Sequence, residues 1–166
     1  IMDVKTLKLL ENVAFPIESQ LHVLRHFIEI CPSLTANISN SALKRIVAYN
    51  GSKFHPSFAQ RPNDLLARII DFGNVSRFEN INFSRLELEL VFKVSDFPNG
   101  IGTSIIVPIK DLSASERTHL KMTTKSGINF FKTSEIQPPT TFNLVLVLHR
   151  VKKNWEVTTC FPGVTS

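Results

Sequence analysis

The sequence predicts an α+β fold, with an N-terminal helical cluster followed by a twisted antiparallel sheet. Apolar residues recur every three to four positions through the first seventy residues, and after about Arg85 this period shortens to two. Because the helices come first and the strands second, the strands are expected to form an antiparallel meander. We expect residues 1–75 to form the helical part and residues 76–166 the sheet part, which carries the active site, in one compact unit.

Four helices are expected, and residues that cap or break helices separate them. Pro16 separates the first two, the polar cluster around Ser39 supplies caps for the third, and Gly73 ends the fourth. The expected ranges are 4–13, 17–30, 42–49 and 64–71.

The strands follow from period-two alternation and from turn residues between the runs. Leu86 to Val94 alternates apolar with polar residues, which predicts one buried face. Apolar residues occupy both faces between Phe142 and Leu148, which predicts a central strand covered on both sides. The other expected strands are 104–109, about 119–124, 128–132 and 154–161.

Lys152 and Lys153 are expected to form the turn of a terminal hairpin. In a regular last strand, alternate residues share a face. One face would then carry Trp155, Val157, Thr159 and Phe161, and the other would carry Glu156, Thr158 and Cys160.

Composition restricts the classes of function. The chain has 166 residues, 43% of them hydrophobic, a net charge of +5 and a pI near 9.4, which favours a globular protein with an anionic partner. No apolar run reaches the roughly 18 to 20 residues that cross a bilayer, so no membrane anchoring is expected. Cys31 and Cys160 lack metal-binding spacing and are expected to be reduced, packed thiols.

No motif for a metal or cofactor site stands out, so neither is expected. His22 and His26 stand one helical turn apart, a spacing that suits a metal, but they fall on the polar side of the expected helix without a third ligand. We therefore expect both histidines to lie on a solvent-exposed face of the helix. Glycine-rich phosphate loops and paired carboxylates are likewise missing from the sequence.

The segment ERTHLKMTTKSG has the residue types that cleave RNA without a metal. In an extended chain Arg117, His119, Lys121 and Thr123 point the same way. The 2′-hydroxyl needs a base, the leaving 5′-oxygen needs an acid, and the phosphorane needs cations, which a histidine between cations supplies. A solvated basic strand face is the alternative reading.

The terminal hairpin gathers further positive charge at its end. The residues that carry it are His149, Arg150, Lys152 and Lys153. A phosphate backbone can follow such a cluster, and Lys125 and Lys132 are expected to extend it. Alternatively, turn lysines discourage aggregation at the edge of a sheet.

The tail TFNLVLVLHRVKKNWEVTTCFPG, with FPNGIGTSIIVPIKDL and ERTHLKM before it, resembles the C-terminal toxin domains of bacterial contact-dependent inhibition and polymorphic toxins. The resemblance covers residues 97–163 and is to the barnase, EndoU, colicin D and RelE group of ribonucleases. It implies RNA cleavage without a metal, a cognate immunity protein, and delivery from the surface as part of a larger secreted protein into the target-cell cytoplasm. It points to Arg117, His119, Thr141 and Thr159, although Cys160 stands where these domains more often have a small residue.

The leading hypothesis is therefore a metal-independent ribonuclease toxin that cleaves by 2′-hydroxyl transesterification. His119 would act as acid or base, Arg117 and Lys121 would stabilise the phosphorane, and Thr141 and Thr159 would orient the phosphate. The alternative is a basic RNA- or protein-binding module without catalysis. A DNase ranks below both for want of carboxylates.

Overall fold

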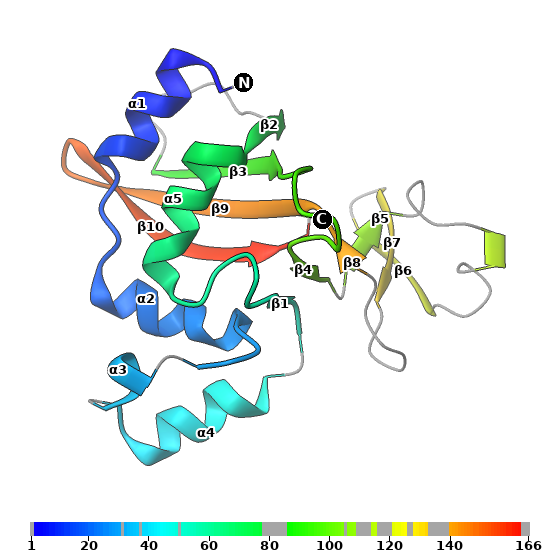
Figure 1. The fold of residues 1–166 in the computed structure, drawn as a ribbon, viewed down its shortest axis with the longest axis horizontal. Coiled ribbons are helices and arrows are strands. Elements are labelled where there is room, and N and C mark those ends of the chain that lie inside the picture. Colours follow the sequence, from blue (N-terminus) through cyan, green and yellow to red (C-terminus); the bar gives the residue numbers. More distant parts are fainter. Residues whose placement is uncertain are drawn as a thin grey trace.

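The computed structural model has the α+β architecture that the sequence predicts (Figure 1). It describes residues 2–30, 32–36, 38–49, 51–77, 86–104, 106–108, 114–115, 121–125, 128–132 and 140–163. Helices dominate the first part of the chain, and antiparallel sheets follow. Among the described helices, none is long and apolar enough to cross a bilayer.

The helices lie where the sequence places them, with two corrections. The side chain of Asp3 caps α1 by accepting a hydrogen bond from the backbone amide of Thr6. The hydroxyl of Ser39 caps α4 in the same way, by accepting from the amide of Ala42. The expected helix 17–30 is wrong beyond Val23, where a 3₁₀ turn replaces it, and the short α3 was not expected. The helical elements are α1 (Val4–Asn12), α2 (Ile17–Val23), η1 (Leu24–His26), α3 (Pro32–Thr35), α4 (Asn40–Ala48) and α5 (Pro62–Phe72).

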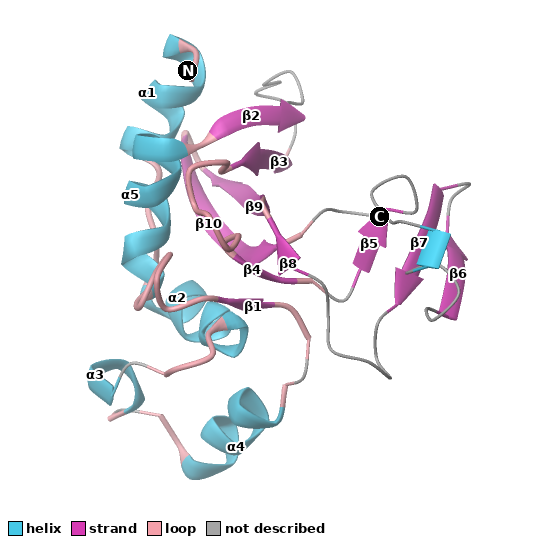
Figure 2. Cartoon of the chain, turned by 45° about the vertical axis from the view of Figure 1, so that its right-hand side comes forward, coloured by secondary structure: helices cyan, strands magenta, loops and turns pink. Residues whose placement is uncertain are grey.

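The described strands form three antiparallel sheets. The largest has the order β10-β9-β3-β2, and the two small ones have the orders β1-β4-β8 and β5-β7-β6. Figure 2 shows the β5-β7-β6 sheet on the far side of the molecule from the helices. The strands are β1 (Lys53–Phe54), β2 (Asn74–Arg77), β3 (Glu87–Lys93), β4 (Gly102–Thr103), β5 (Ile106–Pro108), β6 (Lys121–Lys125), β7 (Ile128–Lys132), β8 (Thr140–Thr141), β9 (Asn143–Val151) and β10 (Asn154–Pro162).

One face of the large sheet packs against helices α1, α2 and α5 (Figure 2). Neighbouring strands present their core residues in rows, such as Leu90, Leu146 and Cys160. The other face, which we call the second face, carries a smaller buried row of Val91 and Val145 with half-buried Phe161. Strand β9 is thus central and buried on both faces, as its sequence predicts.

A β-bulge in β10 changes the expected face of Thr159, Cys160 and Phe161. The register shifts between Val157 and Thr159, so that Thr158 is the extra residue. Beyond the bulge the alternation is reversed, because one inserted residue moves every later side chain to the opposite face. Cys160 is therefore in the main core, and Phe161 lies on the second face, which corrects the sequence prediction for both.

The expectation of a solvated face at His26 is also wrong. Because α2 ends at Val23 and a 3₁₀ turn follows, His26 points inward and is only 6% exposed. Its Nδ1 lies 2.9 Å from the carbonyl oxygen of Ser52, and its ring contacts those of Tyr49 and Phe161. Within the described part of the chain, no three His, Cys, Asp or Glu side chains gather as a metal-binding group.

Candidate functional site

The β9–β10 hairpin places a histidine between two carboxylates on the second face. The turn at Lys152 and Lys153 fixes the register, so that His149 stands opposite Glu156 on one side. On the other side, β3 places Glu87 opposite His149. Residues directly opposite each other in antiparallel strands lie on the same face. Glu87, His149 and Glu156 therefore form one row across three strands.

Two contacts of the imidazole fix its orientation. Nδ1 of His149 lies 2.6 Å from Oγ1 of Thr158, and Nε2 lies 3.7 Å from Oε2 of Glu156. Thr158 reaches the ring because it is the extra residue of the bulge. The side chains of His149 and Glu156 are 40% and 25% exposed, so solvent and a ligand can reach both. This trio, His149, Glu156 and Thr158, is the candidate site.

The candidate site has the parts of an acid–base pair. A histidine titrates near neutral pH, and a neighbouring carboxylate accepts a proton or orients the ring. The hydrogen bond to Thr158 occupies Nδ1 and leaves Nε2, which is the nitrogen near Glu156, for proton transfer. The arrangement can therefore support proton transfer to and from adjacent oxygen atoms of one substrate.

The expected cations of the hairpin do not share one face. Arg150 stands opposite Trp155, a residue of the helix-covered core, whereas His149 lies on the second face. Lys152 is the only non-glycine residue with a positive φ in the described chain, at 57°. This backbone conformation is unfavourable for a lysine, and such strain is often found at functional positions.

The predicted catalytic pair cannot be placed against this site. Arg117 and His119 lie outside the described residues. Lys121 and Lys132 stand opposite each other in the pairing of β6 with β7, and Lys125 ends β6 opposite Ile128. Lys121, which was predicted to stabilise the phosphorane, and the two predicted RNA-binding lysines therefore belong to the β5-β7-β6 sheet, which is separate from the sheet that carries His149.

The two predicted threonines lie in different sheets. Thr141 is in β8, and its hydroxyl accepts a hydrogen bond from the backbone amide of Asn143. Thr159 is in β10 opposite Val147, which puts it on the second face with His149. The Thr159 hydroxyl is buried and has no hydrogen-bond partner among the described residues. Of the two, only Thr159 lies in the sheet of the candidate site.

Sequence reasoning did not single out Glu156, Thr158 or Glu87. The position of Glu156 could have been predicted from the sequence. A two-residue turn at Lys152 and Lys153 pairs Val151 with Asn154, and the same register pairs His149 with Glu156. Thr158 was expected on the same face as Glu156, but its position beside His149 also reflects a bulge that no local sequence signal marks. Glu87 enters through the pairing of β3 with β9, which joins residues far apart in the chain.

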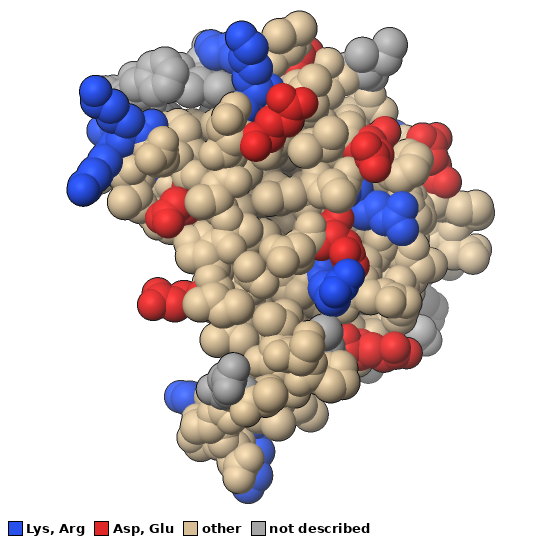
Figure 3. Space-filling view, turned by 60° about the vertical axis from the view of Figure 1, so that its left-hand side comes forward, with Lys and Arg blue, Asp and Glu red and all other residues tan. Residues whose placement is uncertain are grey.

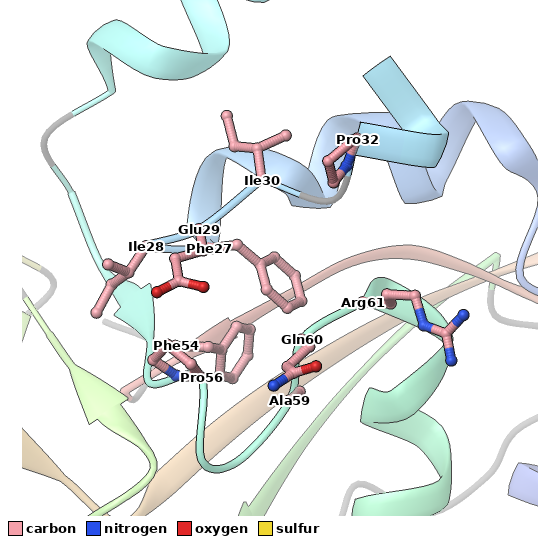
Figure 4. Close-up of a pocket in the computed structure, with 10 residues that line it drawn as sticks. All are labelled: Phe27, Ile28, Glu29, Ile30, Pro32, Phe54, Pro56, Ala59, Gln60 and Arg61. Atoms are coloured by element: carbon pink, nitrogen blue, oxygen red, sulfur yellow. The ribbon is translucent and has the colours of Figure 1, made fainter. Parts of the chain in front are cut away.

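A separate cavity of about 370 Å³ lies between the segment after η1 and the loop that leads into α5 (Figure 4). The rings of Phe27 and Phe54 form part of its wall, and Ile28 and Ile30 add further apolar surface. Among the described lining residues, Arg61 is the only cation, and Figure 4 shows it pointing away from the two rings. Its described lining includes no histidine or lysine, so the cavity is a poorer candidate for phosphate chemistry.

Comparison of the chain with protein-family models, curated proteins and solved structures gives no match.

Proposed function

We propose that the protein is a metal-independent endoribonuclease toxin that uses His149 and Glu156 as its proton-transfer groups. One observation carries the proposal: an accessible histidine is oriented by Thr158 and lies 3.7 Å from the carboxylate of Glu156. The assignment of His149 differs from the sequence hypothesis, in which His119 is the acid or base. His119 remains the rival candidate within the same function.

The reaction needs two neighbouring proton-transfer groups. The carboxylate of Glu156 takes the proton of the 2′-hydroxyl, whose oxygen forms a bond to phosphorus. The bond from phosphorus to the 5′-oxygen breaks, and protonated His149 gives its Nε2 proton to that oxygen. The attacking and leaving oxygens lie on opposite sides of the same phosphorus atom in the phosphorane, so the base and the acid must both reach that atom from one surface, and Glu156 and His149 stand side by side on the second face. The products are a 2′,3′-cyclic phosphate and a 5′-hydroxyl.

Positive charge supports RNA as the substrate. The chain carries a net charge of +5, and Lys152 and Lys153 lie at the hairpin end near the row of His149. Figure 3 shows several Lys and Arg side chains at the upper part of one face, with Asp and Glu side chains beside them, at the level where Figure 1 places α1 and the hairpin. The resemblance of residues 97–163 to contact-dependent inhibition toxins adds a cognate immunity protein, secretion within a larger protein and action in a target cell.

Cleavage of total RNA in EDTA by purified protein tests the proposal. We expect His149→Ala to lower the cleavage rate at least about a hundredfold, since acid–base catalysis contributes on that order or more. Glu156→Gln should lower it similarly, and the cleavage products should carry 2′,3′-cyclic phosphates. His55→Gln is the matched control, because this half-buried histidine lies in the loop after β1, away from the hairpin.

The outcomes separate the rival hypotheses. Full activity of His149→Ala together with an inactive His119→Ala would move the catalytic role to His119 and refute the assignment to Glu156. If the wild-type protein binds RNA but leaves it intact, the ribonuclease proposal fails and the alternative, a non-catalytic RNA-binding module, takes its place. Circular dichroism of each variant confirms that lost activity does not reflect lost fold.

A further inference from the structure

Another pocket lies on the side of the β9–β10 hairpin opposite to His149, where α1 meets the hairpin turn. It has a volume of about 280 Å³, near the lower end of the range of roughly 300–1,000 Å³ for small-molecule sites. Helix α1 and the start of β10 form its walls. We call it the α1 pocket, and its described lining residues are Lys5, Lys8, Leu9, Asn12, Lys153, Asn154 and Trp155.

Every charged residue among the described lining of this pocket is a lysine. Lys5 and Lys8 are three residues apart on α1 and so lie on the same side of the helix. Lys153 approaches from the hairpin turn. None of the three forms an ion pair with a described residue. Three lysines that line one pocket without a carboxylate among its described residues favour an anionic ligand.

Trp155 gives the pocket an aromatic wall. Its side chain is 6% exposed, and its indole Nε1 has no hydrogen-bond partner among the described residues. Because Nε1 is buried, a ligand in the pocket meets the small exposed part of the indole ring and not this donor. Leu9 continues the apolar surface on the opposite wall. The pocket thus combines cations with apolar surface from Leu9 and from the exposed part of Trp155.

Backbone hydrogen bonds hold the two walls together. The Ala14 amide donates to the Trp155 carbonyl, and the Val157 amide donates to the Ala14 carbonyl. The segment that follows α1 therefore pairs with β10 and fixes the end of the helix against the hairpin. A ligand finds both walls already in place, which lowers the entropy lost on binding.

We propose that the α1 pocket binds one nucleotide of a single-stranded RNA. Lys5, Lys8 and Lys153 contact the phosphates, and the base packs against Trp155 and Leu9, because every base has an aromatic face and a backbone phosphate beside it. The choice of RNA as the ligand rests on the proposed function. The pocket and its lysines are observed independently of that function. The site is separate from His149, which faces the other side of the hairpin.

The fluorescence of Trp155, the only tryptophan in the chain, reports on occupancy directly. The probe is a four-nucleotide RNA with methylated 2′-hydroxyls, which cannot be cleaved and so separates binding from catalysis. We expect a saturable change in emission. The logarithm of affinity should fall with the logarithm of salt concentration with a slope of about −2, as three contacts with single-stranded phosphates predict.

The double variant Lys5→Ala/Lys8→Ala should weaken binding at least about tenfold at low salt and reduce the slope to about −0.7. Lys44→Ala/Lys93→Ala is the control, since it removes two exposed lysines of α4 and β3 and the same charge. Equal affinity of the two variants, or an unchanged Trp155 spectrum, would overturn the proposal. Equally tight binding of tripolyphosphate would also overturn it, because that anion has no base. If the protein fails to cleave RNA, the binding measurement still tests this proposal, because the methylated RNA is not a substrate for cleavage.

Discussion

His26 makes the stability of the fold depend on pH. Burial lowers its pKa from 6.5 to about 4, the carbonyl of Ser52 partly opposes this by favouring the protonated ring, and the nearby charges of Arg25, His22 and Lys53 lower it slightly. Between pH 6.5 and 4 the unfolded chain protonates His26 and the folded protein does not. Unfolding is then favoured as the pH falls, and the stabilisation, complete above pH 6.5, disappears toward pH 4. The difference between the two pKa values corresponds to roughly 3 kcal/mol.

Urea unfolding at several pH values measures this term. Between pH 7.5 and 5 we expect His26 to account for a loss of roughly 2 kcal/mol in unfolding free energy. His26→Asn keeps a donor for the Ser52 carbonyl without titrating in this range, so its unfolding free energy should lack this part of the pH dependence, whatever its absolute stability. His55→Gln should retain it. Equal pH dependence in wild type and His26→Asn, or an NMR titration of the His26 ring near pH 6.5, would refute the reasoning.

Two further predictions concern packing. Gly102→Ala should lower the unfolding free energy by about 1–3 kcal/mol in urea titrations, because a Cβ at this position in β4 collides with the carbonyl of Lys53 in β1; a neutral effect would show that the strands separate easily. In a Cys31→Ser variant, Cys160 should resist iodoacetamide at pH 8 until the protein is unfolded, because it is fully buried and burial raises the pKa of its thiol. Rapid alkylation of the folded variant would contradict this.

Local sequence signals predicted the long strands, whereas the short strands β1, β2, β4 and β8 were not expected. Strands β7, β9 and β10 begin within one residue of their expected positions, because alternation and the lysine turn are visible in the chain itself. Cys160 is a free, buried thiol, as expected. What failed were the features set by tertiary structure. Nothing local marks the end of α2 at Val23, since the 3₁₀ turn there serves to bury His26 against Tyr49 and Phe161.

The bulge had the largest effect on the candidate site. A strict period of two places Thr158 and Cys160 on one face and Thr159 and Phe161 on the other. One inserted residue puts Cys160 into the core and Thr159 on the second face, where the Thr158 hydroxyl lies beside His149. A bulge has no fixed sequence signature, so a constellation that depends on one becomes visible only when the strands are paired.

The two proposals meet in the hairpin and divide along its two faces. Successive residues of a strand point to opposite faces, so His149 and Glu156 lie on the second face while Trp155 lies toward α1. Only the turn, Lys152 and Lys153, is common to both sides, and Lys153 already lines the α1 pocket. An RNA strand bound in that pocket would have to pass the turn to reach His149. Under this proposal, the lysine at position 152, where the positive φ favours glycine or asparagine, would contact the RNA backbone as it crosses the hairpin end.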